Sequence, residues 1–162
     1  MILQALLIAL SIGLLLTLNS LITTSWAAKP HFSWTPEIVK NPDLSITVKY
    51  SAKELGKRTA NVTLSSHAIA LIGCVNPGGK LSPSKGTISE EMQIQSVKMN
   101  PEDGKIEGSL TLDPPSVPSV SETCPNKNWS TGILSLTYEN VAMVIKQKNS
   151  EIVKLNLGNV SQ

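Results

Sequence analysis

The stretch LSITVKY, residues 44–50, alternates apolar and polar side chains at every position. In an extended chain its apolar side chains lie on one side and its polar side chains on the other. The stretch therefore predicts a β-strand with one buried face.

Similar alternation recurs downstream, and clusters of Gly, Pro, Asn and Ser separate the alternating runs. No apolar stripe with the period of a helix is found after residue 28. About six or seven short strands without helices are typical of a sandwich of two antiparallel sheets. We therefore expect residues 44–162 to form one all-β domain, a single antiparallel β-sandwich of immunoglobulin-like architecture, with a small antiparallel barrel as the alternative.

Two local features refine this expectation. Between residues 61 and 74 the apolar side chains change parity, from Val62 and Leu64 to Ile69 and Leu71. Since a shift of one residue turns every side chain to the other face, we expect a β-bulge or a break near residues 65–67. The turn-forming sequence NPEDG at 100–104 predicts a β-hairpin over residues 87–112.

The N-terminal segment predicts export. Residues 2–22 carry no charge and are rich in Leu and Ile, and the small-x-small tripeptide Ser25-Trp26-Ala27 follows. This pattern indicates a signal peptide over residues 1–27, with the mature chain beginning near Ala28 and located outside the cytoplasm. The alternative is an uncleaved membrane anchor through residues 2–22. Residues 28–43 contain three prolines and are expected to form an extended segment before the sandwich.

Composition excludes several classes of function. The 162 residues include 14 Lys and Arg against 12 Asp and Glu, a net charge of +2. That balance lacks the basic excess with which proteins bind nucleic acid. With two His and two Cys, the chain is also too poor in ligands for a zinc cluster, and we expect no metal and no cofactor.

The two cysteines, Cys74 and Cys124, are expected to form a disulfide. Outside the cytoplasm, two cysteines in one small domain usually pair. Closing a loop of about 50 residues would stabilise the fold by about 4 kcal/mol. A redox or catalytic role is disfavoured because the sequence has no CxxC motif.

Four segments together resemble a known pattern: Cys74–Lys80 (CVNPGGK), Gly104–Pro115 (GKIEGSLTLDPP), Cys124-Pro125, and Leu134–Val141 (LSLTYENV). Their order and spacing are similar to those of a group of small secreted β-sandwich proteins of unknown function. The group shares the pattern C-x-N-x-G-G-K … G-S-L-T-L-x-P-P … C-P … T-Y-x-N-V. The resemblance implies a secreted β-sandwich with paired cysteines and brings no catalytic residues. The chain departs from the pattern in the segment Cys124-Pro125-Asn126-Lys127, where the group has a Gly-Gln pair.

The remaining residues give little support for a catalytic function. Glu90 and Glu91 are adjacent, but neighbouring side chains of a strand point to opposite faces and cannot converge on one bond. Glu102 and Asp103 lie in the predicted turn, and His67 has no second histidine near it in sequence. We therefore expect the protein not to be an enzyme.

The candidate binding residues are Trp129, Lys80, Lys85 and Lys127. They lie in the loops 75–85 and 113–131, which the expected disulfide would hold side by side at one end of the sandwich. Possible glycosylation sequons begin at Asn61, Asn128 and Asn159.

The expected function is a non-catalytic secreted or cell-surface module for interaction, adhesion or extracellular structure. Its partner would be an extracellular protein or a glycan, with a membrane involved only if the N-terminal segment stays attached. The alternative is a module that binds carbohydrate or another small ligand through the loops near the disulfide.

Overall fold

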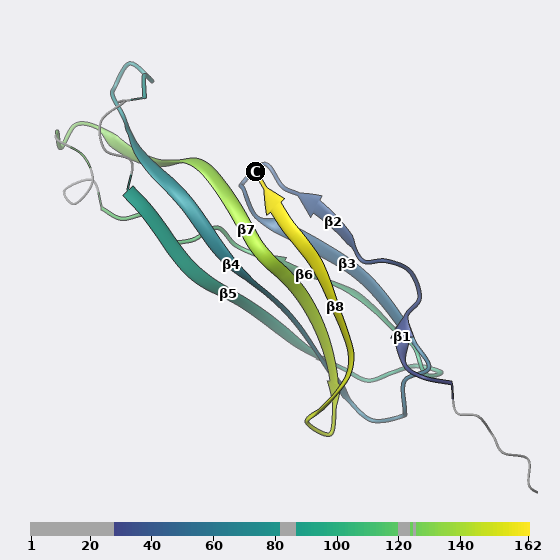
Figure 1. Cartoon of the computed structure of the whole chain (residues 1–162). Coiled ribbons are helices and arrows are strands. Elements are labelled where there is room, and N and C mark those ends of the chain that lie inside the picture. Colours follow the sequence, from purple (N-terminus) through teal and green to yellow (C-terminus); the bar gives the residue numbers. More distant parts are fainter. Residues whose placement is uncertain (1–27, 82–86, 120–123, 125) are drawn as a thin grey trace, which may run out of the picture.

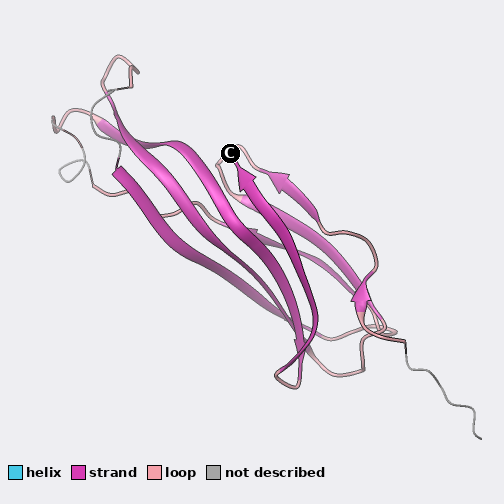
Figure 2. Cartoon of the chain, in the orientation of Figure 1, coloured by secondary structure: helices cyan, strands magenta, loops and turns pink. Residues whose placement is uncertain are grey.

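The computed structural model describes residues 28–81, 87–119, 124 and 126–162. Two antiparallel sheets of four strands each face one another, and no helix occurs among the described residues (Figures 1 and 2). The expectation of an all-β sandwich is therefore confirmed.

Sheet A is built around β3 (Ile46–Lys53). The strand β6 (Ile106–Leu112) pairs with one edge of β3 from Ile46↔Leu112 to Ala52↔Ile106. Two short strands, β1 (His31–Phe32) and β2 (Glu37–Lys40), pair with the other edge. The segment 28–43 therefore contributes an edge of sheet A.

Sheet B has the strand order β5-β4-β7-β8. Its strands are longer: β4 (Ala60–Val75), β5 (Thr87–Met99), β7 (Ser130–Gln147) and β8 (Ser150–Ser161). Because β4 and β7 are the two inner strands, their ends fix which loops lie together.

The assignment of strands to the two sheets resembles that of an immunoglobulin-like sandwich in part. When β2 to β8 are taken as strands A to G, sheet A contains A, B and E, and sheet B contains D, C, F and G. In the constant-type immunoglobulin sandwich the fourth strand pairs with the fifth in the sheet of A, B and E. Here the fourth strand, β5, pairs with β4 in the other sheet.

The predicted hairpin over residues 87–112 is therefore wrong. The strand β5 belongs to sheet B and β6 belongs to sheet A, so residues 100–105 connect the two layers. Within this connection Glu102 and Lys105 exchange two main-chain hydrogen bonds of 2.9 and 2.8 Å, which close a tight turn. The turn signal at 100–104 is real, but a turn alone does not decide whether the following strand returns to the same sheet.

The core lies between the sheets and is filled by the inward side chains of both. The alternating residues of β3 are fully buried, as their pattern predicts. Two tyrosines are the largest buried side chains. The Tyr138 hydroxyl donates to the carbonyl oxygens of Leu44 at 3.0 Å and Leu112 at 3.3 Å, and the Tyr50 hydroxyl lies 3.1 Å from the sulfur of Met99. These contacts satisfy both phenols inside the core.

The expected irregularity near residues 65–67 is present, but the bulge lies on the partner strand. Between Ser65 and His67 the register with β7 shifts from Ala142 to Glu139, so two steps along β4 face three along β7. The extra residue lies beside Asn140, whose φ is 53°. Strand β4 itself keeps its parity: Ala68 and Ala70 are buried.

The apolar residues Ile69 and Leu71 consequently point outward from sheet B. Their change of parity does not mark a bulge in β4, because the pairing of β4 with β5 runs without a shift from Ala60 to Ile72. Small alanines take the inward positions, and larger apolar side chains take the outer face. Leu71 is 38% exposed.

Candidate functional site

The disulfide end of the sandwich, which comprises residues 75–81, 124 and 126–131, is formed where β4 ends and β7 begins (Figure 1). The last residues of β4 pair with the first of β7, as Cys74↔Thr131 and Val75↔Ser130. This register forces the loop that leaves β4 to lie beside the loop that enters β7.

The predicted disulfide joins these loops. Cys74 and Cys124 are bonded, with their Cα atoms 5.6 Å apart, and no free cysteine is present in the described chain. Cys74 is fully buried, whereas Cys124 is partly exposed. The bridge therefore ties a surface loop to the end of an inner strand.

The first loop folds into a compact turn around Asn76. The Asn76 main-chain N–H donates to the Lys80 carbonyl at 3.0 Å, and the Asn76 side-chain oxygen accepts from the Lys80 N–H at 3.0 Å. Gly79 has a φ of 75°, which glycine adopts without steric cost. Val75 and Leu81 then form an antiparallel bridge. Lys80 is thus presented by an ordered turn.

The second loop reaches β7 through a turn around Asn126. The Trp129 N–H donates to the Asn126 carbonyl at 3.0 Å, and the Asn128 N–H donates to the Asn126 side-chain oxygen at 3.0 Å. This side-chain mimic of a backbone turn holds Lys127 and Asn128 at its exposed tip.

The structure brings three of the four candidate binding residues to this end. Lys80 and Lys127 are exposed, and Trp129 is partly buried at the base of its turn. Lys85 lies outside the described residues, as do residues 82–86, 120–123 and 125 of the two loops. The expectation that the loops lie side by side is confirmed where β4 ends and β7 begins, through the disulfide and the Val75↔Ser130 pair. Residues 113–119 contact β5 at Ser89 and Glu91.

Exposed apolar side chains near this end were missed by the sequence reasoning. Leu71 pairs directly with Ile88, which is 64% exposed, and Leu81 is 58% exposed. Leu134 is also exposed and lies against Gly73. The sequence signal for these side chains was the change of apolar parity in β4. The same change also predicts a bulge, so it did not identify an exposed apolar surface.

The three sequons differ in their surroundings. Asn128 is exposed at the tip of a turn, whereas Asn61 lies within the inner strand β4 and is partly buried. The Asn159 side-chain oxygen accepts a hydrogen bond from the Asn140 N–H at 2.9 Å. Asn128 and Asn159 are both exposed, whereas Asn61 is partly buried.

The acidic pairs do not converge. Glu90 lies 3.7 Å from the imidazole of His67, whereas a carboxylate oxygen of Glu91 accepts from the Ser116 N–H at 3.2 Å. Glu102 and Asp103 are exposed in the turn that connects the sheets. Over the described ranges, no group of three His, Cys, Asp or Glu residues could hold a metal ion.

An exposed aromatic side chain, Trp34, lies away from the disulfide end. Trp34 is 42% exposed and lines a shallow depression with polar side chains that include Glu37, Lys49 and Glu107. Lys49 and Glu37 form a surface ion pair of 3.5 Å beside it.

Comparisons with known proteins identify no family. No family model matches the chain, and the search of curated proteins finds no match. Among solved structures the chain is similar to "The structure of a beta-glucuronidase from glycoside hydrolase family 2", with 13% sequence identity and a TM-score of 0.31. The similarity covers 79% of this chain and 10% of that one, too little for any inference about function.

Among residues with a described placement, no helix is long and apolar enough to cross a membrane.

Proposed function

We propose that the protein is a non-catalytic interaction module that acts outside the cytoplasm and binds a partner protein through its disulfide end. The observation that carries the proposal is the Cys74–Cys124 bridge, which ties two hydrogen-bonded turns together at the end of β4 and β7. Loops held by a rigid scaffold are a common location of binding residues. A pre-ordered loop also loses less entropy when it engages a partner.

The chemistry of this end suits a protein partner. Leu81 and the neighbouring Leu71–Ile88 pair supply exposed apolar area, and Trp129 supplies an aromatic anchor. Lys80 and Lys127 add positive charge, which favours an acidic counterpart and speeds the encounter with it.

Export supports the same proposal. The uncharged apolar segment 2–22 and the Ser-Trp-Ala tripeptide are the features of a signal peptide ending at residue 27. A structural disulfide persists in oxidising compartments and is rare in the cytosol. Sequencing the N-terminus of the exported protein tests this; we expect Ala28, and an intact Met1 would contradict cleavage.

Carbohydrate binding is the second candidate function. Tryptophan rings stack well on sugars, and both Trp129 and the exposed Trp34 have polar neighbours. Trp34, beside Glu37 and Lys49, is the better placed of the two for such stacking because its depression is open to solvent.

A paired experiment separates the two candidates. The exported protein is applied to a glycan array and, in parallel, used to capture partners from the native extracytoplasmic fraction before and after protease treatment. A protein module gives capture that protease abolishes and no glycan signal. Glycan binding that Trp34→Ala removes would favour the second candidate instead.

A further inference from the structure

The two edges of sheet B differ sharply. At one edge, the pairing of β8 with β7 contains several register shifts, and Gly158 adopts a φ of 84°. At the other edge, β5 pairs with β4 without interruption from Ala60↔Met99 to Ile72↔Thr87. Natural proteins protect exposed edges with bulges, prolines or short strands. Strand β5 is 13 residues long and contains neither proline nor glycine.

The far edge of β5 is open within the described part of the chain. Its only paired strand there is β4, so one row of its main-chain N–H and C=O groups faces away from the sheet. Residues 113–119 approach β5 through side chains: Glu91 accepts from Ser116, and Ser89 donates to its carbonyl. An unbulged edge of this length is a template for another strand.

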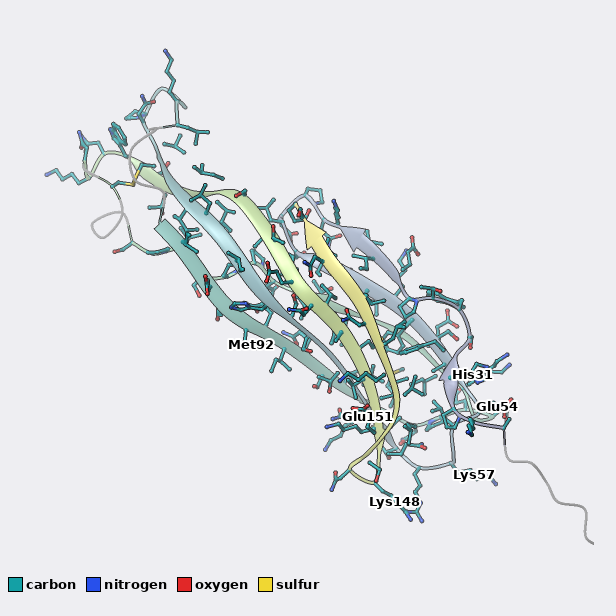
Figure 3. The ribbon with its side chains drawn as sticks, viewed as in Figure 1. His31, Glu54, Lys57, Met92, Lys148 and Glu151 are labelled. Carbon is teal, nitrogen blue, oxygen red and sulfur yellow. A yellow bond between two sulfur atoms is a disulfide. The ribbon has the colours of Figure 1, made fainter. Side chains whose placement is uncertain are left out.

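The outward face of β5 is apolar where a solvated edge strand would be polar. Ile88, Met92 and Ile94 are 64%, 61% and 58% exposed, and Met92 is labelled beside β5 in Figure 3. They share this face with Glu90 and Lys98, since alternate residues of a strand point the same way. The strand therefore carries an acidic residue in its first half and a basic residue at its end.

This order of charges is self-complementary. If a second copy pairs antiparallel with Ile94 opposite its own equivalent, Glu90 lies opposite Lys98 of the second copy. Two-fold symmetry makes the same pair twice. On the other face the same register sets Gln93 opposite Gln95, whose amides can hydrogen-bond. Opposite charges and apolar residues directly across an antiparallel pair both stabilise the pairing.

We propose that two copies of the protein associate through β5, so that sheet B continues from one copy into the other. Main-chain hydrogen bonds along the open edge supply the attachment, and the Ile94 pair with the two Glu90–Lys98 pairs sets the register. This surface shares Ile88 with the apolar area beside the disulfide-end turns, but its register is set by Ile94, Glu90 and Lys98. The inference does not depend on the proposed function.

Charge reversal tests the register directly. Glu90→Lys and Lys98→Glu each place like charges opposite one another in both symmetric pairs, while the double variant restores opposite charges. An equimolar mixture of the single variants also restores them, because the lysine introduced in one copy then faces the glutamate introduced in the other. Glu151→Lys and Lys154→Glu, on the irregular edge strand β8, are matched controls.

Sedimentation velocity on the exported protein, from micromolar to millimolar concentrations, provides the readout. The parent protein is expected to dimerise, and each single variant to dimerise at least about tenfold more weakly. The double variant, the mixture and both β8 controls are expected to match the parent. Circular dichroism checks that each variant is folded. If a charge-reversal variant does not fold, Ile94→Lys takes its place, because it sets two lysines opposite each other and should also weaken dimerisation.

Three results would overturn the proposal. The parent could remain monomeric throughout the concentration range. Every β5 variant could dimerise as strongly as the parent, which would place the contact between copies elsewhere. Finally, the single variants could weaken dimerisation without rescue in the double variant or in the mixture, which would exclude the antiparallel register.

Discussion

The hydroxyl of Ser66 donates a hydrogen bond of 2.8 Å to the main-chain carbonyl of Glu139, across the bulge between β4 and β7. Ser66 is only 2% exposed and occupies an inward position among apolar side chains. The extra residue of β7 disrupts the ladder at this point, and the serine provides a partner for the displaced carbonyl. A polar side chain in the core is thus explained by the irregularity of the neighbouring strand.

Replacing Ser66 with alanine should therefore destabilise the fold. Without the hydroxyl the Glu139 carbonyl loses its partner in a partly buried site, which costs about 1–3 kcal/mol of unfolding free energy. Urea denaturation measures the effect. Ser65→Ala, one residue away on the outer face, is the matched control and should change stability by less than about 0.5 kcal/mol. Equal effects of the two substitutions would contradict this role for Ser66.

Because the hydroxyl of Tyr138 is buried, the free energy of unfolding should decrease at alkaline pH. Burial, followed by the charges of Asp113 and Asp43, raises the pKa of Tyr138 well above its usual range. In the unfolded chain a tyrosine loses its proton from about pH 10, whereas the folded protein retains it. The stabilisation is therefore fully present below about pH 10 and is lost as pH rises through the folded pKa.

Tyr138→Phe removes both the hydrogen bonds of the hydroxyl and its titration, and these two effects appear at different pH values. At neutral pH the variant should be less stable by about 1–2 kcal/mol, because the Leu44 and Leu112 carbonyls lose their donor. Above about pH 10 its unfolding free energy should fall less steeply than that of the parent. Parallel pH profiles would show that Tyr138 does not titrate differently on folding. Burial also raises the pKa of Tyr50, so part of the slope should remain in the variant.

Removing the disulfide should weaken the fold without changing it. The bridge closes a loop with a sequence separation of 50 residues, and the double variant Cys74→Ala/Cys124→Ala should lose about 4 kcal/mol. Thiol titration of the denatured, unreduced parent should detect no free thiol. Two reactive thiols, or an unchanged unfolding midpoint in the double variant, would contradict a stabilising bridge.

Gly108 should not tolerate a side chain. It faces the core from β6, and a Cβ at this position would lie 3.0 Å from the Tyr50 hydroxyl. To admit Gly108→Ala the phenol, which contacts Met99, must shift by a few tenths of an ångström. Overpacking of this kind costs about 1–3 kcal/mol. Gly132→Ala is the control, since a Cβ there meets no atom within 4 Å. Thermal unfolding of both variants tests the difference.

The sequence predicts alternation well and strand partners poorly. The alternation in 44–50 identified the buried face of β3. In β7 the buried positions change parity between Tyr138 and Val141, where the bulge lies. The change in β4 had another cause, because Ile69 and Leu71 lie on the outer face of a regular strand. Nothing in the 100–104 turn distinguishes a hairpin from a crossing between layers, so the pairing of β5 with β4 was missed.

The candidate site was predictable in outline because of its covalent bond. Once Cys74 and Cys124 pair, the loops that contain them must lie together, and the structure confirms this for the described residues. The exposed apolar side chains of Leu71, Leu81 and Ile88 were not predictable as a surface. The pairing of Leu71 with Ile88 depends on the register between β4 and β5, which local sequence does not specify.

The most direct test of partner binding at the disulfide end compares variants at the two ends of the sandwich. The captured partner is titrated against the parent, against Trp129→Ala and Lys127→Glu at the disulfide end, and against Asp103→Lys in the turn at the opposite end. We expect Trp129→Ala to weaken binding by about 2 kcal/mol or more, Lys127→Glu to weaken it most in low salt, and Asp103→Lys to bind as the parent does. Unchanged affinity in both disulfide-end variants, or loss of binding in Asp103→Lys alone, would contradict a binding site at the disulfide end.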